Sequence, residues 1–261
     1  MKKIIKKIIK SSFRMLNIGI TKNSTLLRLE KNVSAVNDIE LLLMLNNENA
    51  YQLLNNLQKS TSQLRQDLFV LSELNFKKNG YFVEFGATNG VDLSNTYLME
   101  KEFGWTGILS EPANYWHKKL KNNRNAHIET RCIWRNSDSI LNFNETNTKE
   151  LSTINFYSDF DLHHEERKNG KSYDVKTISL NDLLIKYNAP KEIDYLSIDT
   201  EGSEFEILSH FDFSRHHFNV ITCEHNFTPM REKIFCLLSS NGYVRKFQEL
   251  SKFDDWYVKL K

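Results

Sequence analysis

The segment YFVEFGATNGVDLSNTYLMEKEFGWTGILSEP, residues 81–112, constrains the fold more than any other part of the chain. It predicts a buried strand over 81–85, a glycine-containing turn, a helix over 94–103 and a second strand over 107–110 that ends at Glu111. Such a strand–turn–helix–strand unit is typical of parallel sheets that bind nucleotides at the carboxyl ends of their strands. The unit alone leaves open whether the chain transfers a hydride, a phosphoryl group or a methyl group.

The rest of the chain continues the alternation of strands and helices. We therefore expect an α/β fold, with a mostly parallel twisted sheet, helices on both faces and a C-terminal antiparallel hairpin at the sheet edge. The expected elements are a helix over 114–122, a strand over 127–132, a strand over 194–198, a helix over 204–210, a strand in FNVITCEHN, a helix in REKIFCLLSSNGY, and hairpin strands in YVRKFQEL and DWYVKL.

Three segments lie outside this alternation. Residues 38–57 are apolar at helical spacing and lack proline and glycine, so we expect one or two helices there. A helix over 63–74 then leads to the first strand, which suggests an N-terminal helical extension over 1–60 and one α/β domain over 61–261. Residues 137–181 are rich in polar side chains and are expected to form an insertion near the mouth of the sheet.

The first sixteen residues, MKKIIKKIIKSSFRML, place isoleucines on one helical face and lysines on the others. One interpretation of this basic amphipathic pattern is weak contact with an anionic membrane surface. We favour a terminal helix whose isoleucine face packs on protein, because a short apolar face binds bilayers weakly. The segment lacks the long apolar region and the cleavage site of a secretory signal.

The composition excludes several classes of protein. Hydrophobic residues make up 40% of the 261 residues and aromatic residues 12%, which is too many for a disordered chain. The 35 lysines and arginines nearly balance the 33 acidic residues, so the formal charge of +2 does not favour nucleic acid as a partner. Cys132, Cys223 and Cys236 show neither zinc spacing nor a disulfide pattern, which predicts a cytoplasmic protein. Homo-oligomerisation is left open.

The turn after the first strand indicates the kind of nucleotide ligand. Dinucleotide-binding turns need a second glycine where the backbone approaches a pyrophosphate, but that position is Thr88 in the sequence Gly86-Ala87-Thr88. Glu84, on the strand before the turn, would repel a pyrophosphate and attract a cationic amino group. Glu111 can accept hydrogen bonds from the ribose hydroxyls of either kind of cofactor. These observations favour S-adenosylmethionine, which carries an ammonium group and no phosphate.

Side chains with acid–base chemistry follow two later strands. Asp199 and Glu201 come after the strand over 194–198, and Glu224 and His225 end the next strand. We expect them to converge, because the carboxyl ends of parallel strands meet at one edge of a sheet. In one scheme, His225 or Asp199 is the general base for an acceptor hydroxyl. In the other, Asp199, Glu201 and Glu224 hold a divalent ion that lowers the hydroxyl pKa. We favour the base, because acids grouped in sequence say little about geometry.

Four segments, VEFGATNGVDLSNT, GWTGILSEP, VKTISLNDLL and DYLSIDTEGSEFEIL, resemble those of the FkbM family of S-adenosylmethionine-dependent methyltransferases. The resemblance covers most of the chain after residue 60. It implies a Rossmann-like class I methyltransferase fold, methyl transfer to oxygen on sugars or polyketides, and cofactor binding by Glu84 to Gly90 and Glu111, with Asp199 in the acidic motif. The residues expected to contact the cofactor are Glu84, Phe85, Gly86, Ala87, Thr88, Gly90, Ser94, Asn95, Glu111, Pro112, Cys132 and Asp199.

We expect the acceptor to be a hydroxyl of a sugar or sugar nucleotide, in the biosynthesis of a bacterial capsule or surface polysaccharide. His163, His164 and Arg167 in the insertion, and Asn226 after the second acidic strand, are expected to contact it. A charge run such as HHEER is, however, more often a solvated surface. The alternatives are an NAD-dependent oxidoreductase and a non-catalytic binding protein that retains the fold.

Overall fold

The computed structural model describes residues 35–158 and 163–260. The chain divides into two compact units, Met1–Met44 and Leu45–Lys261. In the first unit, the described residues form a helix over 35–43. The basic helix expected for the first sixteen residues lies outside the described residues. No helix in the two described ranges is long and apolar enough to cross a membrane.

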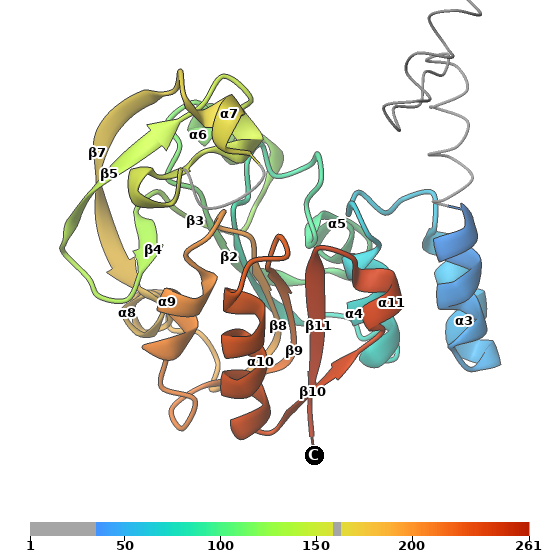
Figure 1. The fold of residues 1–261 in the computed structure, drawn as a ribbon. Helices are drawn as coiled ribbons and strands as arrows, with labels where there is room; N and C mark the ends of the chain where they lie inside the picture. Colours follow the sequence, from blue (N-terminus) through green and yellow to red (C-terminus); the bar gives the residue numbers. More distant parts are fainter. Residues whose placement is uncertain (1–34, 159–162, 261) are drawn as a thin grey trace, which may run out of the picture. The chain divides into compact units, whose positions relative to one another are not determined.

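A seven-stranded sheet forms the centre of the second unit (Figure 1). Its strands, in spatial order, are β10 (Tyr243–Lys246), β11 (Asp254–Lys259), β9 (His217–Glu224), β8 (Glu192–Ile198), β1 (Tyr81–Phe85), β2 (Thr106–Ser110) and β3 (His127–Glu129). The strands from β9 to β3 pair in parallel, whereas β11 is antiparallel to both β9 and β10. The expected mostly parallel sheet with a C-terminal antiparallel hairpin is confirmed.

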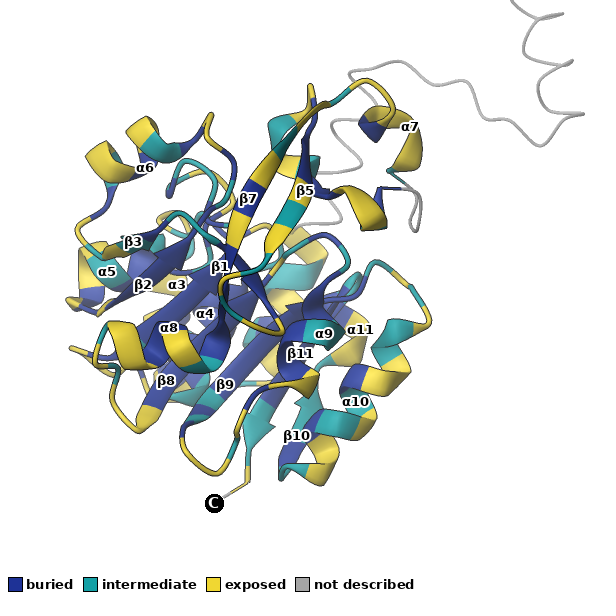
Figure 2. Ribbon diagram, turned by 90° about the vertical axis from the view of Figure 1, so that its left-hand side faces the viewer, coloured by how far each residue is buried: buried dark blue, intermediate teal, exposed yellow. Residues whose placement is uncertain are grey.

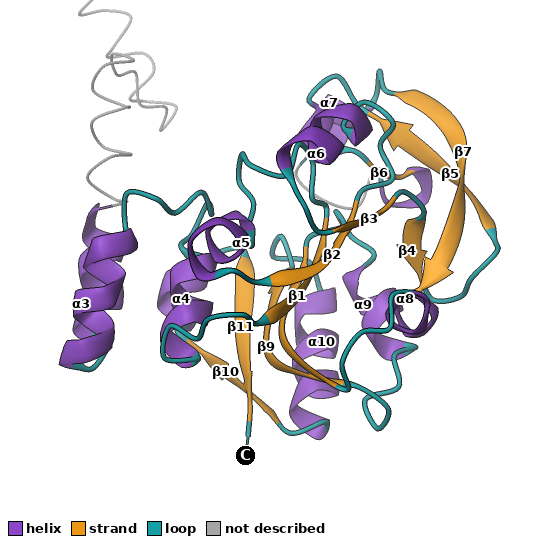
Figure 3. Ribbon diagram, turned by 180° about the vertical axis from the view of Figure 1, so that it is seen from behind, coloured by secondary structure: helices purple, strands orange, loops and turns teal. Residues whose placement is uncertain are grey.

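Helices cover both faces of this sheet (Figure 3). On one face, α8 (Leu180–Lys186), α9 (Glu204–Ser209) and α10 (Met230–Ser240) bury leucine and isoleucine side chains against the strands. On the other face lie α4 (Gln66–Glu73) and α5 (Tyr97–Phe103). The central strands are buried on both sides (Figure 2), which explains their nearly continuous apolar sequences. The remaining α-helices of the sheet region are α3 (Asn47–Asn56), α6 (His117–Asn123) and α11 (Gln248–Ser251).

The order of the strands places the binding site. From β1 the chain first builds β2 and β3 on one side, and later returns to build β8 and β9 on the other side. Ligands of open α/β sheets bind beyond the carboxyl ends of the strands at such a switch point. The ends of β1 and β8 are therefore the place to look for a cofactor.

The region that we expected to be a polar insertion folds as a second sheet. Its strands are β4 (Cys132–Trp134), β7 (Lys171–Ser179), β5 (Ile140–Glu145) and β6 (Thr153–Ile154), in that order. The sheet has its own apolar cluster, formed by Ala113, Trp116, Cys132, Trp134, Phe143, Ile154 and Val175. Polar composition hid this sheet, because most residues in the first part of β7 are exposed and continuous burial begins only at Thr177. Short helices complete the region: η1 (Lys149–Leu151), η2 (Asn155–Tyr157) and α7 (His164–Arg167).

Two sequence-based boundaries were wrong. The strand expected over 127–132 is two strands in different sheets, β3 and β4. The chain turns between them because the backbone N–H of Arg131 and its guanidinium group both donate to the Glu129 carboxylate, at 2.9–3.0 Å. The helix expected over 94–103 begins only at Tyr97, because the residues before it bind a buried carboxylate, as described below.

Candidate cofactor and acceptor site

A cavity of about 400 Å³ lies at the switch point. One end is lined by residues that follow β1 and β2, among them Gly86, Thr88, Asn95 and Glu111. Gly86 has a φ of +73°, and a Cβ atom there would run into the carbonyl oxygen of Asp199. Glycine is therefore required for two reasons, its left-handed backbone and the close approach of the ends of β1 and β8.

Glu111 presents its carboxylate to this cavity. One carboxylate oxygen accepts a hydrogen bond from the backbone N–H of Thr88 and the other from that of Ala113, each at 2.8 Å. Burial raises the pKa of Glu111 to about 7, and the nearby acids Asp199 and Glu145 add to the shift. Each oxygen keeps a further lone pair, which suits the two hydroxyls of a ribose.

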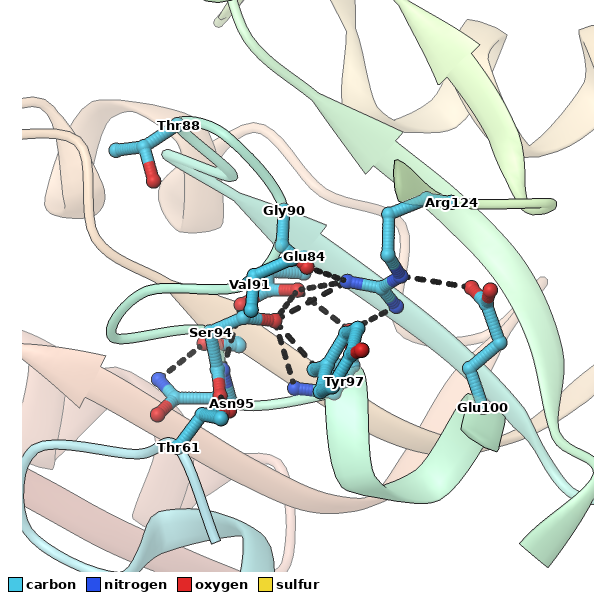
Figure 4. Close-up of polar contacts among 12 residues, drawn as sticks. Thr61, Glu84, Thr88, Gly90, Val91, Ser94, Asn95, Tyr97, Glu100 and Arg124 are labelled. Carbon is cyan, nitrogen blue, oxygen red and sulfur yellow. Dashed lines mark hydrogen bonds and ion pairs between the residues drawn. The ribbon is translucent and has the colours of Figure 1, made fainter. Parts of the chain in front are cut away.

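Glu84 has partners within the chain. Its carboxylate accepts hydrogen bonds from the Ser94 hydroxyl at 3.0 Å, from the Asn95 backbone N–H at 2.8 Å and from the Thr96 hydroxyl (Figure 4). It does not line the cavity. The geometry therefore does not support the expectation that Glu84 binds a cationic amino group. Its hydrogen bonds instead stabilise the loop between β1 and α5.

Arg124 completes this cluster from the end of α6. Its side chain is fully buried, and it donates to Glu100 at 2.8 Å, to the Gly90 carbonyl at 3.0 Å, to Ser94 at 3.1 Å and to Thr96 at 2.8 Å. One guanidinium nitrogen lies 3.7 Å from the Glu84 carboxylate. The hydroxyls thus accept from Arg124 and donate to Glu84, so a buried cation and two acids are connected by hydrogen bonds (Figure 4).

Asn95 is a polar residue of the cavity wall. Its side-chain amide donates to the Ser197 hydroxyl at 2.9 Å, while its backbone N–H is held by Glu84. Its side-chain oxygen is buried and has no hydrogen-bond partner among the described residues. An unpaired acceptor on a cavity wall is suited to a ligand that carries a donor, such as the ammonium group of S-adenosylmethionine.

The expected cofactor contacts are thus divided by the structure. Those that line the cavity are Phe85, Gly86, Thr88, Asn95, Glu111, Pro112, Cys132 and Asp199. Those that do not line it are Glu84, Ala87, Gly90 and Ser94. Cys132 is buried, and burial raises the pKa of its thiol to about 12, so it serves as an apolar surface.

Three carboxylates converge at the other end of the cavity. Asp199 follows β8, Glu201 lies in the next turn and Glu224 ends β9, and one oxygen of each lies within 4.8 Å of the others. Asp199 is accessible to solvent from the cavity. The surrounding protein nevertheless removes most of the bulk water around its carboxylate, and this desolvation raises the pKa of Asp199. Burial also raises the pKa of Glu224, and the charge of Asp199 adds to this shift.

The turn that carries Glu201 is held in an unusual backbone conformation. Glu201 has a φ of +57°, which costs a non-glycine residue roughly 1–2 kcal/mol, and Gly202 follows with a φ of +118°. Glu204, the first residue of α9, accepts hydrogen bonds from the backbone N–H groups of Thr200 and Gly202, each at 3.0 Å. Glu204 is therefore structural, and it holds the turn that aims Glu201 at the cavity.

A second cavity, of about 430 Å³, adjoins the same carboxylates. Glu201, Glu224 and Asn226 line both cavities. Its other walls are largely apolar and come from η2, α9 and the start of α10; they include Phe156, Tyr157, Phe205, Pro229 and Met230. Glu201 and Glu224 therefore lie at the junction of a cavity suited to a cofactor and one suited to an acceptor, with Asp199 beside them on the wall of the first cavity.

His225 lines only the second cavity. Its ring nitrogen Nδ1 accepts a hydrogen bond from the Phe227 backbone N–H at 3.0 Å. Burial lowers the pKa of His225, so the neutral ring carries its proton on Nε2, which lies 3.8 Å from Asp255. In this arrangement the ring offers no free lone pair to either cavity.

The expected acceptor contacts in the second sheet region are not together. His163 lines the first cavity, whereas His164 is exposed and lies 3.2 Å from Glu165. Arg167 is buried and donates to Glu201 at 2.7 Å. Only part of the charge run is thus a solvated surface.

Sequence reasoning missed many residues of the cavity wall, among them the polar pair Gln66 and Asp254. The Gln66 side-chain amide donates to Asp254 at 2.8 Å, and Asp254 pairs with Glu224 in the register of β11 and β9. Burial raises the pKa of Asp254 to about 8. The sequence offered one signal, the acid Asp254 at the start of the last strand. No local pattern connects Asp254 with Gln66, which lies 188 positions earlier.

A nucleoside-binding acid, a turn without the pyrophosphate glycine and a carboxylate cluster beyond the sheet define an α/β enzyme with a nucleoside cofactor. Residues 84–260 match the methyltransferase FkbM domain, so the chain belongs to the FkbM methyltransferase family. It is an S-adenosylmethionine-dependent methyltransferase. Among the cavity residues, Glu111 and Asn95 have hydrogen-bonding groups that fit this cofactor. Membership of the family favours methyl transfer over the hydride transfer that the segment over 81–112 left open.

Similar solved structures are distant in sequence. Precorrin-6y C5,15-methyltransferase from Geobacter metallireducens GS-15 is 12% identical over 74% of this chain and 85% of its own, with a TM-score of 0.40. The methyltransferase domain of METTL16 is 12% identical over 73% of this chain and 63% of its own, with a TM-score of 0.37. No curated protein matches the chain.

Replacing Arg124 should destabilise the fold. Arg124→Met would leave two buried acids without their cation, and we expect the free energy of unfolding to fall by about 3–5 kcal/mol in urea titrations. Arg124→Lys should recover only part of the loss, because an ammonium group cannot reach the same set of acceptors. Arg215→Met, at an exposed site, is the control. A loss below about 1 kcal/mol for Arg124→Met would contradict the role of the cluster.

The affinity for S-adenosylmethionine should depend on the protonation of Glu111. The charged carboxylate accepts from both ribose hydroxyls, and with its pKa near 7 this form is lost as the pH falls. We expect calorimetry to show weaker binding as the pH is lowered from about 8 to about 6. Glu111→Gln should bind at least about tenfold more weakly, without this pH dependence. An identical pH dependence in both proteins would assign it to another group.

Proposed function

We propose that the protein is an O-methyltransferase that acts on a hydroxyl of a sugar or sugar nucleotide, in the cytoplasmic stages of bacterial capsule or surface polysaccharide biosynthesis. The observation that carries the proposal is the position of Glu201 and Glu224 at the junction of the two cavities, with a carboxylate oxygen of Asp199 within 4.8 Å of theirs. A hydroxyl acceptor must lose a proton on methylation, and carboxylates at this position can receive it.

Bound S-adenosylmethionine supplies a methyl group on a sulfonium sulfur; its transfer breaks the carbon–sulfur bond, forms the carbon–oxygen bond and releases the hydroxyl proton. Glu111 orients the nucleoside end of the cofactor, and Gly86 lets the ends of β1 and β8 approach beside it. Positioning of the reacting groups provides much of the rate enhancement in such a displacement.

Of the two candidate general bases, we assign Asp199 as the group that takes the proton of the acceptor hydroxyl. The lone pair of His225 on Nδ1 is used by the Phe227 N–H, whereas Asp199 lies on the wall of the first cavity, where solvent reaches it. His225 then acts as a packing residue of the second cavity, where its ring meets Phe227 edge-on.

The second cavity suits a ring-shaped acceptor that bears hydroxyls. Aromatic side chains, among them Tyr157 and Phe205, offer apolar faces, while Glu201 and Asn226 at the inner end offer hydrogen-bonding groups. Apolar walls with a few converging polar groups are the usual composition of a small-molecule site. His163, on the wall of the first cavity, is a further candidate contact.

A screen of nucleotide-linked sugars tests the function. Incubation with S-adenosylmethionine should give a sugar nucleotide heavier by one methyl group in mass spectrometry. Asp199→Asn should lower the turnover of that substrate by roughly 10²–10⁴-fold, the usual contribution of a general base. Asp174→Asn, an exposed acid on β7, should leave turnover unchanged. Methylation of an amine in place of any sugar hydroxyl, or normal turnover in Asp199→Asn, would contradict the proposal.

A further inference from the structure

We propose that Asp199, Glu201 and Glu224 bind one divalent cation of the Mg²⁺ or Mn²⁺ class at the junction of the two cavities. The inference builds on the proposed function, because a cation there would also contact the acceptor hydroxyl. Its geometric basis is the convergence of one carboxylate oxygen from each residue within 4.8 Å of the others. Two of the residues are fixed by strand ends, Asp199 after β8 and Glu224 in β9.

An unsatisfied oxygen in this cluster points to a ligand. Glu224 is only 8% exposed, and its Oε2 atom has no hydrogen-bond partner among the described residues, although the side chain lines both cavities. A buried polar atom without a partner costs about 1–3 kcal/mol, and more when it is charged. A cation bound between the three acids would supply the missing partner.

The surroundings leave the cluster with excess negative charge. Arg167 donates to Glu201 at 2.7 Å, and its own side chain is fully buried. Two further acids, Glu204 and Asp254, stand nearby with neutral partners, the backbone and Gln66. In the described ranges, no arginine or lysine forms an ion pair with Asp199 or Glu224. Asp199 and Glu224 thus face each other without a basic partner, so binding of a cation between them would be favourable.

The chemistry of the donors selects the kind of cation. All three donors are carboxylate oxygens, which are the ligands that Mg²⁺ and Mn²⁺ prefer, and softer metals are favoured by sulfur or imidazole. The imidazole beside the cluster, His225, uses its Nδ1 lone pair for the Phe227 N–H. With few protein ligands, such an ion keeps positions for water or for a substrate oxygen.

The ion would activate the acceptor without changing the atom balance of the reaction. Each carboxylate needs to give only one oxygen to the ion, so the second oxygen of Asp199 remains to take the proton. Polarisation by the ion lowers the pKa of the hydroxyl, its proton passes to Asp199, and its oxygen forms the bond to the methyl carbon as the bond to sulfur breaks. The cluster thereby combines the two schemes that the sequence left open.

Direct binding of Mn²⁺ tests the inference without any acceptor. In electron paramagnetic resonance titrations of the full chain, we expect one Mn²⁺ to bind per chain and Mg²⁺ to displace it. Glu224→Gln and Asp199→Asn should each weaken binding at least tenfold, because each removes one anionic ligand. Glu232→Gln, an exposed acid on α10, should bind Mn²⁺ as the unmodified chain does. Circular dichroism melting identifies any variant that fails to fold.

Two results would overturn the inference: no stoichiometric binding of Mn²⁺, or binding that neither Glu224→Gln nor Asp199→Asn weakens. The proposed function is tested separately by the methyl transfer assay with and without a chelator. Undiminished transfer in the chelator would remove the ion and leave the O-methyltransferase intact. Mn²⁺ binding at these acids in a chain that methylates no hydroxyl would support the ion and remove the function.

Discussion

The buried ion cluster around Arg124 is the interaction on which the site depends. The loop from β1 to α5 must leave the sheet, line the cavity and start a helix within a few residues. Two of its non-glycine residues, Thr88 and Leu93, have left-handed backbones, as do Gly86 and Gly90. Such a loop would have many alternatives if its groups faced water. Here Glu84 and Arg124 both form hydrogen bonds with the hydroxyls of Ser94 and Thr96 in the interior of the protein. These bonds fix the loop in the conformation in which Thr88 and Asn95 line the cavity.

This arrangement explains why an acid before a glycine turn need not be a ligand. Glu84 supports the loop of the site, and we propose that Glu111 and Asn95 make the direct polar contacts with the cofactor. A buried cation paired with acids is costly to desolvate, but it fixes one conformation when every donor and acceptor is satisfied. The same division recurs at β8, where Glu204 holds the turn and Glu201 faces the cavity.

The sequence predicted the features that depend on local patterns. Apolar runs placed β1, β2, β8 and β9, Gly86 placed the turn, and acids at strand ends placed Asp199 and Glu224 at one edge. Contacts between residues far apart in the sequence could not be predicted, because the charge and size of a side chain do not specify which distant residue it will bind. Arg124 lies 40 positions after Glu84, Arg167 lies 34 before Glu201, and neither pair follows any periodicity. The second sheet escaped detection because β4 and β6 have only three and two residues and the longer β5 and β7 are rich in polar residues.

The central claim is that the switch-point cavity binds S-adenosylmethionine and not a dinucleotide. Calorimetry of the full chain with S-adenosylmethionine, and separately with NAD, tests it most directly. We expect one molecule of S-adenosylmethionine to bind per chain with micromolar affinity or better, about −8 kcal/mol, and no heat of binding for NAD at the same concentrations. Stoichiometric binding of NAD, with no response to S-adenosylmethionine, would contradict the account.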